Sequence, residues 1–239
     1  MSVDYILGFL RKPFILDKDI IKIDSLFEIF KISIIGYLLL ISILIVVSMV
    51  VRVPLAMMGL MPSEPPIDIN PRYIILACLL APIYEELIFR LSLRFKPIYL
   101  LISITLFTLL ILKRQIGLPF GLIASSLVLL IGSYLLFVDK RLGICNKLGV
   151  FWQNHYSIVF YSSVLIFGLL HIFNYQNLTW KHYLLSPLIV LPQIIMGLFW
   201  GYIRLKYDKG LYISILMHLF NNITSTAIRF FTIGILFWP

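Results

Sequence analysis

The chain has 239 residues, of which 61% are hydrophobic and only 13% are charged, and its mean hydropathy is +1.00. A soluble domain usually carries about a quarter of its residues as charged side chains, and one aqueous core of this size cannot bury so much apolar sequence. These values exclude an ordinary soluble enzyme. They favour a protein whose helices cross a lipid bilayer.

The net charge of +9 does not indicate nucleic-acid binding, because no basic run is interleaved with aromatic residues. Basic residues collect in the cytoplasmic loops of membrane proteins, which explains the charge without a nucleic-acid partner. Cys78 and Cys145 have no paired spacing and predict neither a disulfide nor a metal site. His155 and His182 lie near the ends of apolar segments, so we expect both to be interfacial.

Residues 1–31 mix charged with large apolar side chains, a composition typical of a helix that lies on the membrane surface. The first long apolar run begins too late, and lacks the cleavage signature, for a cleaved signal peptide. We therefore expect an interfacial N-terminal segment at 1–31, followed by a single membrane domain at 32–239.

Seven apolar segments of spanning length follow in this domain. The expected spans are 32–51, 73–93, 97–112, 118–138, 151–173, 183–203 and one that begins at Leu211. The tail through Pro239 either extends the seventh helix or forms a short eighth. The sequence thus predicts an all-α, polytopic membrane protein with seven or eight transmembrane helices.

The distribution of basic residues orients these spans. With the N-terminus in the cytoplasm, thirteen Lys and Arg side chains fall on the inner side and six on the outer side, with Arg90 inside a span. Basic residues favour the cytoplasmic side of a membrane. We expect a protein of the cell membrane with a cytoplasmic N-terminus.

Two adjacent glutamates, Glu85 and Glu86, lie inside an apolar run. A charge at the bilayer centre costs about 3 kcal/mol even on lenient insertion scales, so the pair needs partners or a wet cavity. Arg90 follows Glu86 by four residues and can form an ion pair with it on one helix face. Glu85 then points about 100° away and becomes a candidate general base.

Histidines occur in two later spans. His171 follows Phe167 by one helical turn, and Asn222 follows His218 by one turn, so the members of each pair share a helix face. Hydrolysis of a peptide bond needs a base that activates water and donors that stabilise the oxyanion formed during attack. Glu, His and Asn side chains are suited to these tasks.

Each pattern taken alone has a structural explanation. The Glu86–Arg90 pair is more often a structural ion pair than a catalytic element. A single His171 is more often a hydrogen-bonding residue between helices, and His218 with Asn222 could equally join helices. Their joint occurrence, in order and each within an expected span, favours a functional site.

The ordered patterns are Glu85-Glu86-x-x-x-Arg90, Phe167-x-x-x-His171 and His218-x-x-x-Asn222. This order resembles the CPBP intramembrane proteases, which include the type II CAAX prenyl endopeptidases and the bacterial Abi, or bacteriocin self-immunity, proteins. The resemblance covers roughly residues 73–229 and extends to the flanking segments 197–201 and 209–216.

The resemblance implies that six residues form a catalytic site: Glu85, Glu86, Arg90, His171, His218 and Asn222. It implies that Glu85 and His171 activate the attacking water. His218 and Asn222 would stabilise the oxyanion, and the remaining two residues would support the site.

The residue types alone do not decide whether the predicted site binds a metal ion. Glu85, His171 and His218 could bind zinc with an open fourth position, but no His-Glu-x-x-His motif is present. The resemblance favours a glutamate-dependent mechanism without a cofactor, and zinc remains the alternative.

One feature departs from the resemblance. Glu86 and His171 are 85 positions apart, whereas the family pattern implies consecutive spans. An inserted helical hairpin at 97–138 accounts for the excess. Two added spans preserve the direction of every later span, so the three patterns can still meet.

The leading prediction is an intramembrane endopeptidase whose substrate is a membrane protein or a lipid-anchored peptide, not necessarily a prenylated one. The alternative is a non-proteolytic relative that acts as a membrane regulator, a bacteriocin immunity factor or a scaffold. A proton-coupled transporter is disfavoured, because the sequence has no inverted repeat and no pair of broken helices.

Overall fold

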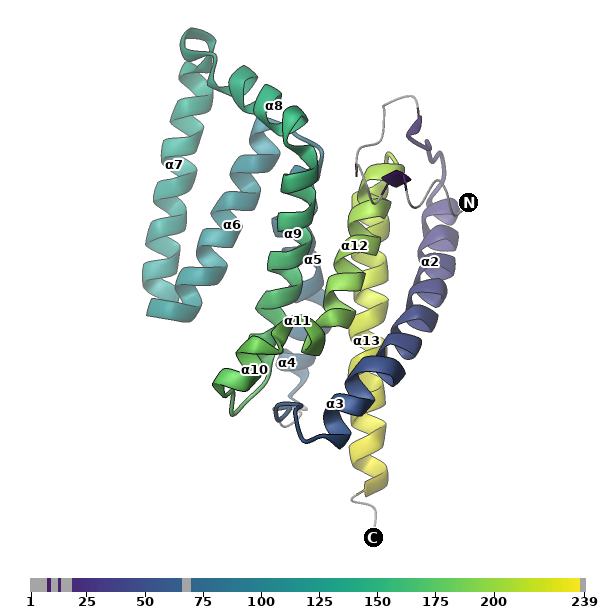
Figure 1. The fold of residues 1–239 in the computed structure, drawn as a ribbon. Coiled ribbons are helices and arrows are strands. Elements are labelled where there is room, and N and C mark those ends of the chain that lie inside the picture. Colours follow the sequence, from purple (N-terminus) through teal and green to yellow (C-terminus); the bar gives the residue numbers. More distant parts are fainter. Residues whose placement is uncertain (1–7, 10–12, 14–18, 66–69, 237–239) are drawn as a thin grey trace.

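A computed structural model describes residues 8–9, 13, 19–65 and 70–236 of the chain. These residues form an assembly of helices (Figure 1), and they contain no strand, only two isolated β-bridges. The expected all-α architecture is confirmed. Most of the large apolar side chains on the outer helices are exposed, as in a protein surrounded by lipid.

Within the described residues, four helical stretches are long and apolar enough to cross a membrane: Leu26–Met57, Pro97–Ile116, Leu118–Asp139 and Tyr156–Asn174. Two other long helical stretches, 71–89 and Gly210–Leu236, carry charged and polar residues of the ordered patterns, which lower their hydropathy. The chain is therefore a helical membrane protein. The count of seven or eight spans and the cytoplasmic N-terminus stay predictions.

The first long helix runs without a break through three elements: α2 (Leu26–Val47), the π-helical turn η2 (Ser48–Arg52) and α3 (Val53–Met57). It begins earlier than expected because Ser25 caps it, accepting a hydrogen bond from the Glu28 amide at 3.2 Å. Residues 26–31 thus belong to this helix and not to a separate surface helix. Residues 20–25 are not helical; about half of the expected interfacial segment, at 1–7, 10–12 and 14–18, lies outside the described residues.

The helix with the two glutamates is also built from three elements: α4 (Pro71–Ile75), the π-helical turn η3 (Leu76–Leu80) and α5 (Ala81–Phe89). Asn70 caps its start, and the short 3₁₀ turn η4 (Leu91–Leu93) follows its end. Pro82 lacks an amide hydrogen and so leaves a carbonyl of the preceding turn without its donor. The Ala81 amide donates to Leu76, five residues back, which makes the turn π-helical.

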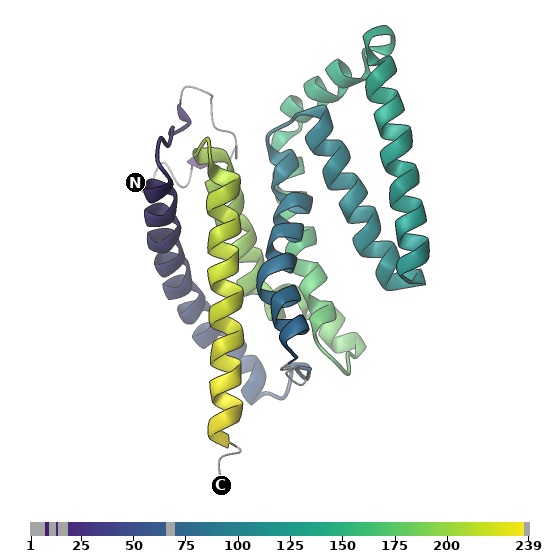
Figure 2. The same cartoon turned by 180° about the vertical axis from the view of Figure 1, so that it is seen from behind.

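The hairpin expected at 97–138 consists of α6 (Pro97–Ile116) and α7 (Leu118–Leu142); that it is an insertion stays a prediction. Gly117 joins them with a φ of 95°, a conformation that favours glycine. Figure 2 shows the hairpin at one edge of the molecule, with α2 and α13 at the opposite edge. Within the described chain, α6 packs against α7 and α5, so α5 connects the hairpin to the remaining helices.

The second half of the chain supplies the remaining helices. They are α8 (Ile144–Asn154), α9 (Tyr156–Leu170), the 3₁₀ turn η5 (His171–Asn174), α10 (Trp180–Leu184), α11 (Ser186–Ile189), α12 (Leu191–Lys206) and α13 (Gly210–Leu236). Residues 151–154, expected at the start of the fifth span, belong instead to the separate helix α8. The last helix, α13, runs unbroken to Leu236, so the described tail extends the seventh segment and forms no eighth helix.

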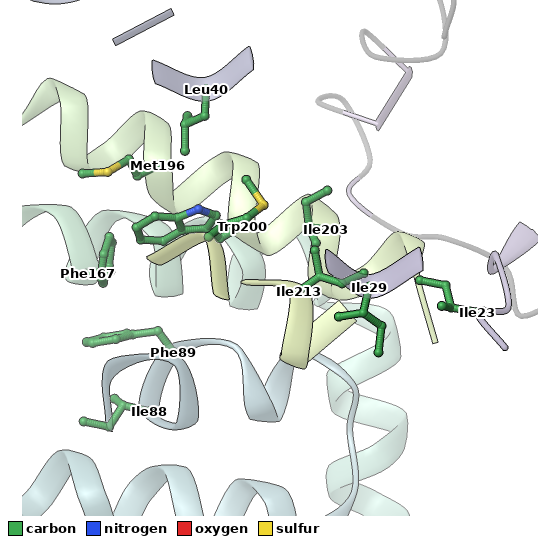
Figure 3. Packing of buried hydrophobic residues seen from close by; sticks show 11 residues of the cluster. Ile23, Ile29, Leu40, Ile88, Phe89, Phe167, Met196, Trp200, Ile203 and Ile213 are labelled. Atoms are coloured by element: carbon green, nitrogen blue, oxygen red, sulfur yellow. The ribbon is translucent and has the colours of Figure 1, made fainter. Parts of the chain in front are cut away.

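An aromatic core holds the central helices together. Figure 3 shows Trp200 of α12 packed near Phe167 of α9, with Phe89 of α5 beside it. The rings of Phe167 and Trp200 are 6.0 Å apart and those of Phe167 and Phe89 are 5.5 Å apart, both edge to face. Because these three helices also carry or flank the ordered patterns, the core fixes their relative positions.

Two arginines tie the end of α5 to the turn between α12 and α13. Arg204, which is buried, donates to the carbonyls of Arg90 and Leu91 at 3.1 and 3.3 Å. Arg94 donates to the carbonyls of Leu205 and Tyr207 at 3.0 and 2.8 Å. Two of these carbonyls also accept backbone amides, Arg90 from Leu93 and Tyr207 from Gly210, so the arginines add a second hydrogen bond to each of them. Together, the hydrogen bonds from Arg204 and Arg94 set the depth of α5 relative to α13.

Small residues allow α9 and α12 to approach closely. A Cβ atom at Gly201 would lie 2.8 Å from a ring carbon of Phe160, and one at Gly197 would lie 3.2 Å from Phe167. The small pair on α12 thus packs against α9 of the same chain.

We expect Gly201→Ala to lower stability by about 1–3 kcal/mol through overpacking, because the Phe160 ring is fully buried and has no room to move. Gly36→Ala is the matched control: its new Cβ would lie 3.1 Å from the flexible end of Met217 and at an ordinary contact distance of 3.7 Å from Phe199. Both changes gain the same helix propensity. The difference between their melting temperatures in detergent therefore measures the cost of the steric overlap at position 201. Equal melting temperatures for the two variants would contradict this packing.

Candidate active site

A polar cavity of about 830 Å³ opens among the central helices. Its lining includes four residues of the ordered patterns, Glu85, His171, His218 and Asn222, together with Gln193 and Met196 of α12. Three separate helical segments, α5, α9 with η5, and α13, thus bring these side chains to one space. The expectation that they share a cavity agrees with this geometry.

Glu85 lies between two histidines. Its Oε2 atom is 3.9 Å from Nε2 of His171 and 3.6 Å from Nε2 of His218. The Glu85 side chain is a quarter exposed and lines the cavity, whereas its Oε2 atom is buried and makes no hydrogen bond within the described part of the chain. Glu85 has no partner on its own helix, as expected, but it has two neighbours on other helices.

His171 is held in one tautomer by the helix that precedes it. Its Nδ1 atom is 2.8 Å from the carbonyl oxygen of Phe167, one turn earlier. A carbonyl can only accept a hydrogen bond, so Nδ1 carries the hydrogen and donates it. The Nε2 atom of a neutral His171 therefore presents its lone pair to Glu85. The four-residue spacing of Phe167 and His171 produces this arrangement directly.

His218 connects the two glutamates. Its Nδ1 atom donates to Oε1 of Glu86 at 3.2 Å, and its Nε2 atom faces Glu85. The ring stacks on Trp200, with centroids 4.1 Å apart and planes inclined by 26°. A hydrogen bond at one end and a stacked indole on one face fix the imidazole orientation.

Glu86 and Arg90 form a fully buried pair below the cavity. Arg90 Nε is 3.7 Å from Glu86 Oε1, and the two side chains are 1% and 0% exposed. The guanidinium carbon lies 3.9 Å from the ring centre of Phe167 and 5.7 Å from that of Trp200, a cation–π arrangement. The predicted ion pair is thus present, surrounded by aromatic rings.

Asn222 binds the carbonyl that the proline of α5 exposes. Its Nδ2 atom donates to the Ala77 oxygen at 2.9 Å. The Ala81 amide is directed to Leu76 instead, and Pro82 has no amide hydrogen. The Ala77 carbonyl can therefore accept from α13, which fixes the Asn222 side chain at the cavity wall. The second hydrogen of the same amide remains available to another acceptor.

A charged cluster forms the rim of the cavity. Glu64 lies between two arginines, with carboxylate oxygens 3.5 Å from Arg52 and 3.4 Å from Arg229. Arg52 also donates to the Tyr175 hydroxyl at 3.0 Å. This cluster links η2, the following loop and α13 across the cavity.

The other two histidines are far from these contacts. His155 stacks on Phe151 at the end of α8, and His182 accepts a hydrogen bond from the Thr179 amide at the start of α10. Neither lines the polar cavity.

Sequence reasoning missed several contributors, namely Ala77, Trp200, Gln193 and the rim residues. The X-Pro pair at Ala81-Pro82 is a signal for a free carbonyl four or five residues earlier. Nothing in the local sequence marks Trp200 as the partner of His218, because the contact joins different helices.

Within the described residues, no group of three or more His, Cys, Asp and Glu side chains is arranged to hold a metal ion. The donors of a tetrahedral zinc site lie roughly 3.4 Å apart, since each is about 2.0–2.1 Å from the metal. The separations from Glu85 to His171 and His218 are somewhat longer than this.

Comparison with known proteins identifies one family. Residues 69–224 match the model of the type II CAAX prenyl endopeptidase Rce1-like family. The match covers about two thirds of the chain and includes all three ordered patterns. No curated protein and no solved structure matches the chain.

We expect Arg90→Met to destabilise the protein by about 3–5 kcal/mol, because it leaves the buried Glu86 carboxylate without its cation. The double variant Glu86→Gln/Arg90→Met removes both charges and should recover part of this loss. Thermal or denaturant unfolding of both variants in detergent measures the difference. If the double variant is less stable than Arg90→Met, the ion pair is not what the arginine contributes.

Proposed function

Because the chain belongs to the type II CAAX prenyl endopeptidase Rce1-like family, we propose that it is an intramembrane endopeptidase. Its substrate is a membrane protein or a lipid-anchored peptide, cut at a peptide bond that reaches the polar cavity. One observation carries the proposal: Glu85 lines the polar cavity, and its unbonded Oε2 atom lies between Nε2 of His171 and Nε2 of His218. A purely structural ion pair does not need this arrangement.

Glu85 and His171 hold and activate the attacking water. Both the Glu85 carboxylate and Nε2 of His171 are hydrogen-bond acceptors, and a water molecule has two hydrogens to donate. Such a water would present its oxygen lone pairs to a substrate carbonyl. During attack the Glu85 carboxylate takes the water proton and passes it to the leaving amide nitrogen.

In this proposal, His218 and Asn222 would face the oxygen of the reacting carbonyl. His218 donates from Nδ1 to Glu86, so its Nε2 must also carry a hydrogen to act on the oxyanion. That Nε2–H group and the second amide hydrogen of Asn222 would stabilise the negative charge that develops on the carbonyl oxygen. Both groups are already held in place by neighbouring residues, so little reorganisation is needed when charge develops. Glu86 and Arg90 act as positioning residues.

We also propose that residues 73–229 form the protease core, and that the protein lies in the cell membrane with its N-terminus in the cytoplasm. The excess of basic residues on that side supports this orientation. Labelling of single cysteines with a membrane-impermeant thiol reagent in intact cells tests it.

We expect Glu85→Gln and His171→Ala each to lower the cleavage rate by roughly 10²–10⁴-fold, the usual contribution of general acid–base groups. His155→Ala is the matched control, because this histidine lies away from the cavity. Purified variants in phospholipid vesicles are given a library of transmembrane peptides, and new termini are identified by mass spectrometry. If the wild type cleaves nothing and both variants keep the cellular phenotype, the protein is a non-proteolytic regulator or scaffold.

We expect activity to survive treatment with a zinc chelator, because the proposed mechanism uses no cofactor. The same vesicle assay with and without chelator measures this. Loss of cleavage that added Zn²⁺ restores would instead assign Glu85, His171 and His218 as metal ligands.

A further inference from the structure

The wall of the polar cavity follows two helices from the proposed reacting groups to one end of the molecule. On the helix with the two glutamates, the wall extends from Glu85 back to Tyr73, and on α13 it extends from His218 to Arg229. An α-helix rises 1.5 Å per residue, so each of these stretches spans roughly 16–18 Å. Glu85 and His218 therefore lie deep in the cavity, far from its rim.

The cavity is open at its rim and closed at its floor. At the rim, the side chains of Glu64 and Arg229 are 51% and 40% exposed. Beneath the reacting groups, Glu86, Arg90 and Trp200 are completely or almost completely buried. Among the described residues that line the cavity, none comes from the part of the molecule beyond this floor. A substrate therefore reaches Glu85 through the rim and not through the floor.

A smaller cavity of about 90 Å³, which also reaches Glu85 and His171, leads in the same direction. Its other polar wall residues are Arg114 and Asn174. Arg114 belongs to the last turn of α6 and donates to the Phe173 carbonyl at 2.7 Å, close to the rim residue Tyr175 in the chain. Both cavities thus extend from Glu85 toward one end of the molecule.

The two ends of the molecule face opposite sides of the bilayer. Figure 1 shows α3 and α10 at the rim end, and α8 with the start of α2 at the opposite end. The stretch Leu26–Met57, which is long and apolar enough to cross a membrane, runs from the opposite end to the rim end. At the opposite end, Lys206 donates to the Asp19 carbonyl at 3.2 Å, which joins the turn between α12 and α13 to the segment before α2.

The two ends also differ in their basic residues. Of the twenty Lys and Arg residues, the sequence assigns thirteen to the cytoplasmic side, and these include Lys31 and Lys209 at the end opposite the rim. The six assigned to the outer side include Arg52 and Arg229 at the rim itself. Because basic residues favour the cytoplasmic side, the rim lies on the side away from the cytoplasm.

We propose that the polar cavity opens to the extracytoplasmic side of the membrane, and that the substrate is a polypeptide segment that enters the cavity from that side. The proposal rests on the proposed endopeptidase function and on the proposed orientation. An extended chain spans about 3.3–3.6 Å per residue, so the bond that is cut lies about five residues from the point where the substrate passes the rim.

The test uses three single-cysteine variants of a parent protein in which Cys78 and Cys145 are replaced by Ala. Ser225→Cys lies in the cavity wall, Ser63→Cys lies in the loop at the rim, and Lys209→Cys lies at the opposite end. All three residues are exposed. Intact and permeabilised cells are treated with a membrane-impermeant thiol reagent, and the labelled fraction of each variant is measured.

We expect Ser63→Cys and Ser225→Cys to react in intact cells, and Lys209→Cys to react only after permeabilisation. Failure of Ser225→Cys to react in intact cells would overturn the proposal, because the cavity would then have no aqueous path to the outside. Reaction of Lys209→Cys in intact cells would contradict it as well, since the end opposite the rim would not face the cytoplasm.

A second measurement connects access with cleavage. Transmembrane peptides with a long hydrophilic flank are added from outside to vesicles that carry the parent or Ser225→Cys, with or without prior treatment by the same reagent. We expect the treatment to abolish cleavage by Ser225→Cys and to leave cleavage by the parent unchanged.

The outcomes separate the two proposals. If Ser225→Cys labelled from outside still cleaves the peptides, the substrate does not enter through the rim, and the endopeptidase function stands without this entry route. If the untreated parent cleaves no peptide, the endopeptidase function fails, and the assignment of the substrate fails with it.

Discussion

The site depends on one carboxylate, that of Glu86, which is completely buried and shared between two helices. On its own helix it pairs with Arg90, and across the core it accepts a hydrogen bond from His218 of α13. A buried charge is tolerated only when partners compensate the lost hydration. The same oxygen atom therefore fixes the register between α5 and α13 and aims the His218 ring at Glu85.

Around this carboxylate, aromatic packing and site geometry depend on the same residues. Phe167 covers the Arg90 guanidinium and packs against Trp200, and its carbonyl fixes the tautomer of His171. Trp200 in turn stacks on His218. A change in the core of this protein consequently alters the orientation of the groups proposed to act on a substrate.

The sequence predicts the helical class, because it follows from composition and local spacing. The six residues proposed for the site stay a prediction, and four of them line one cavity. Glu86–Arg90 and Phe167–His171 are one helical turn apart, so their contacts could be predicted without a structure. The link from His218 to Glu86 could not, since it joins residues 132 positions apart. The sequence places the start of the first span at residue 32, because charged residues precede it. In the structure the helix begins at Leu26, directly after the cap at Ser25. The sequence predicts a hairpin at 97–138, but it does not predict how closely α6 packs against α5, because that distance depends on contacts between different helices.

Two prolines, each after a π-helical turn, alter the backbone hydrogen bonds at the wall of the polar cavity. Pro82 follows η3, and Pro54 follows η2, where the Val53 amide donates five residues back to Ser48. In each helix the proline removes one intrahelical donor and the widened turn redirects a carbonyl. Both turns line the polar cavity, through Ser48 and Ala77. In a bilayer such backbone oxygens need a partner or water. The Ala77 oxygen accepts a hydrogen bond from Asn222. This bond stabilises the irregular segment of the helix, which would be unfavourable in lipid, at the wall of the cavity.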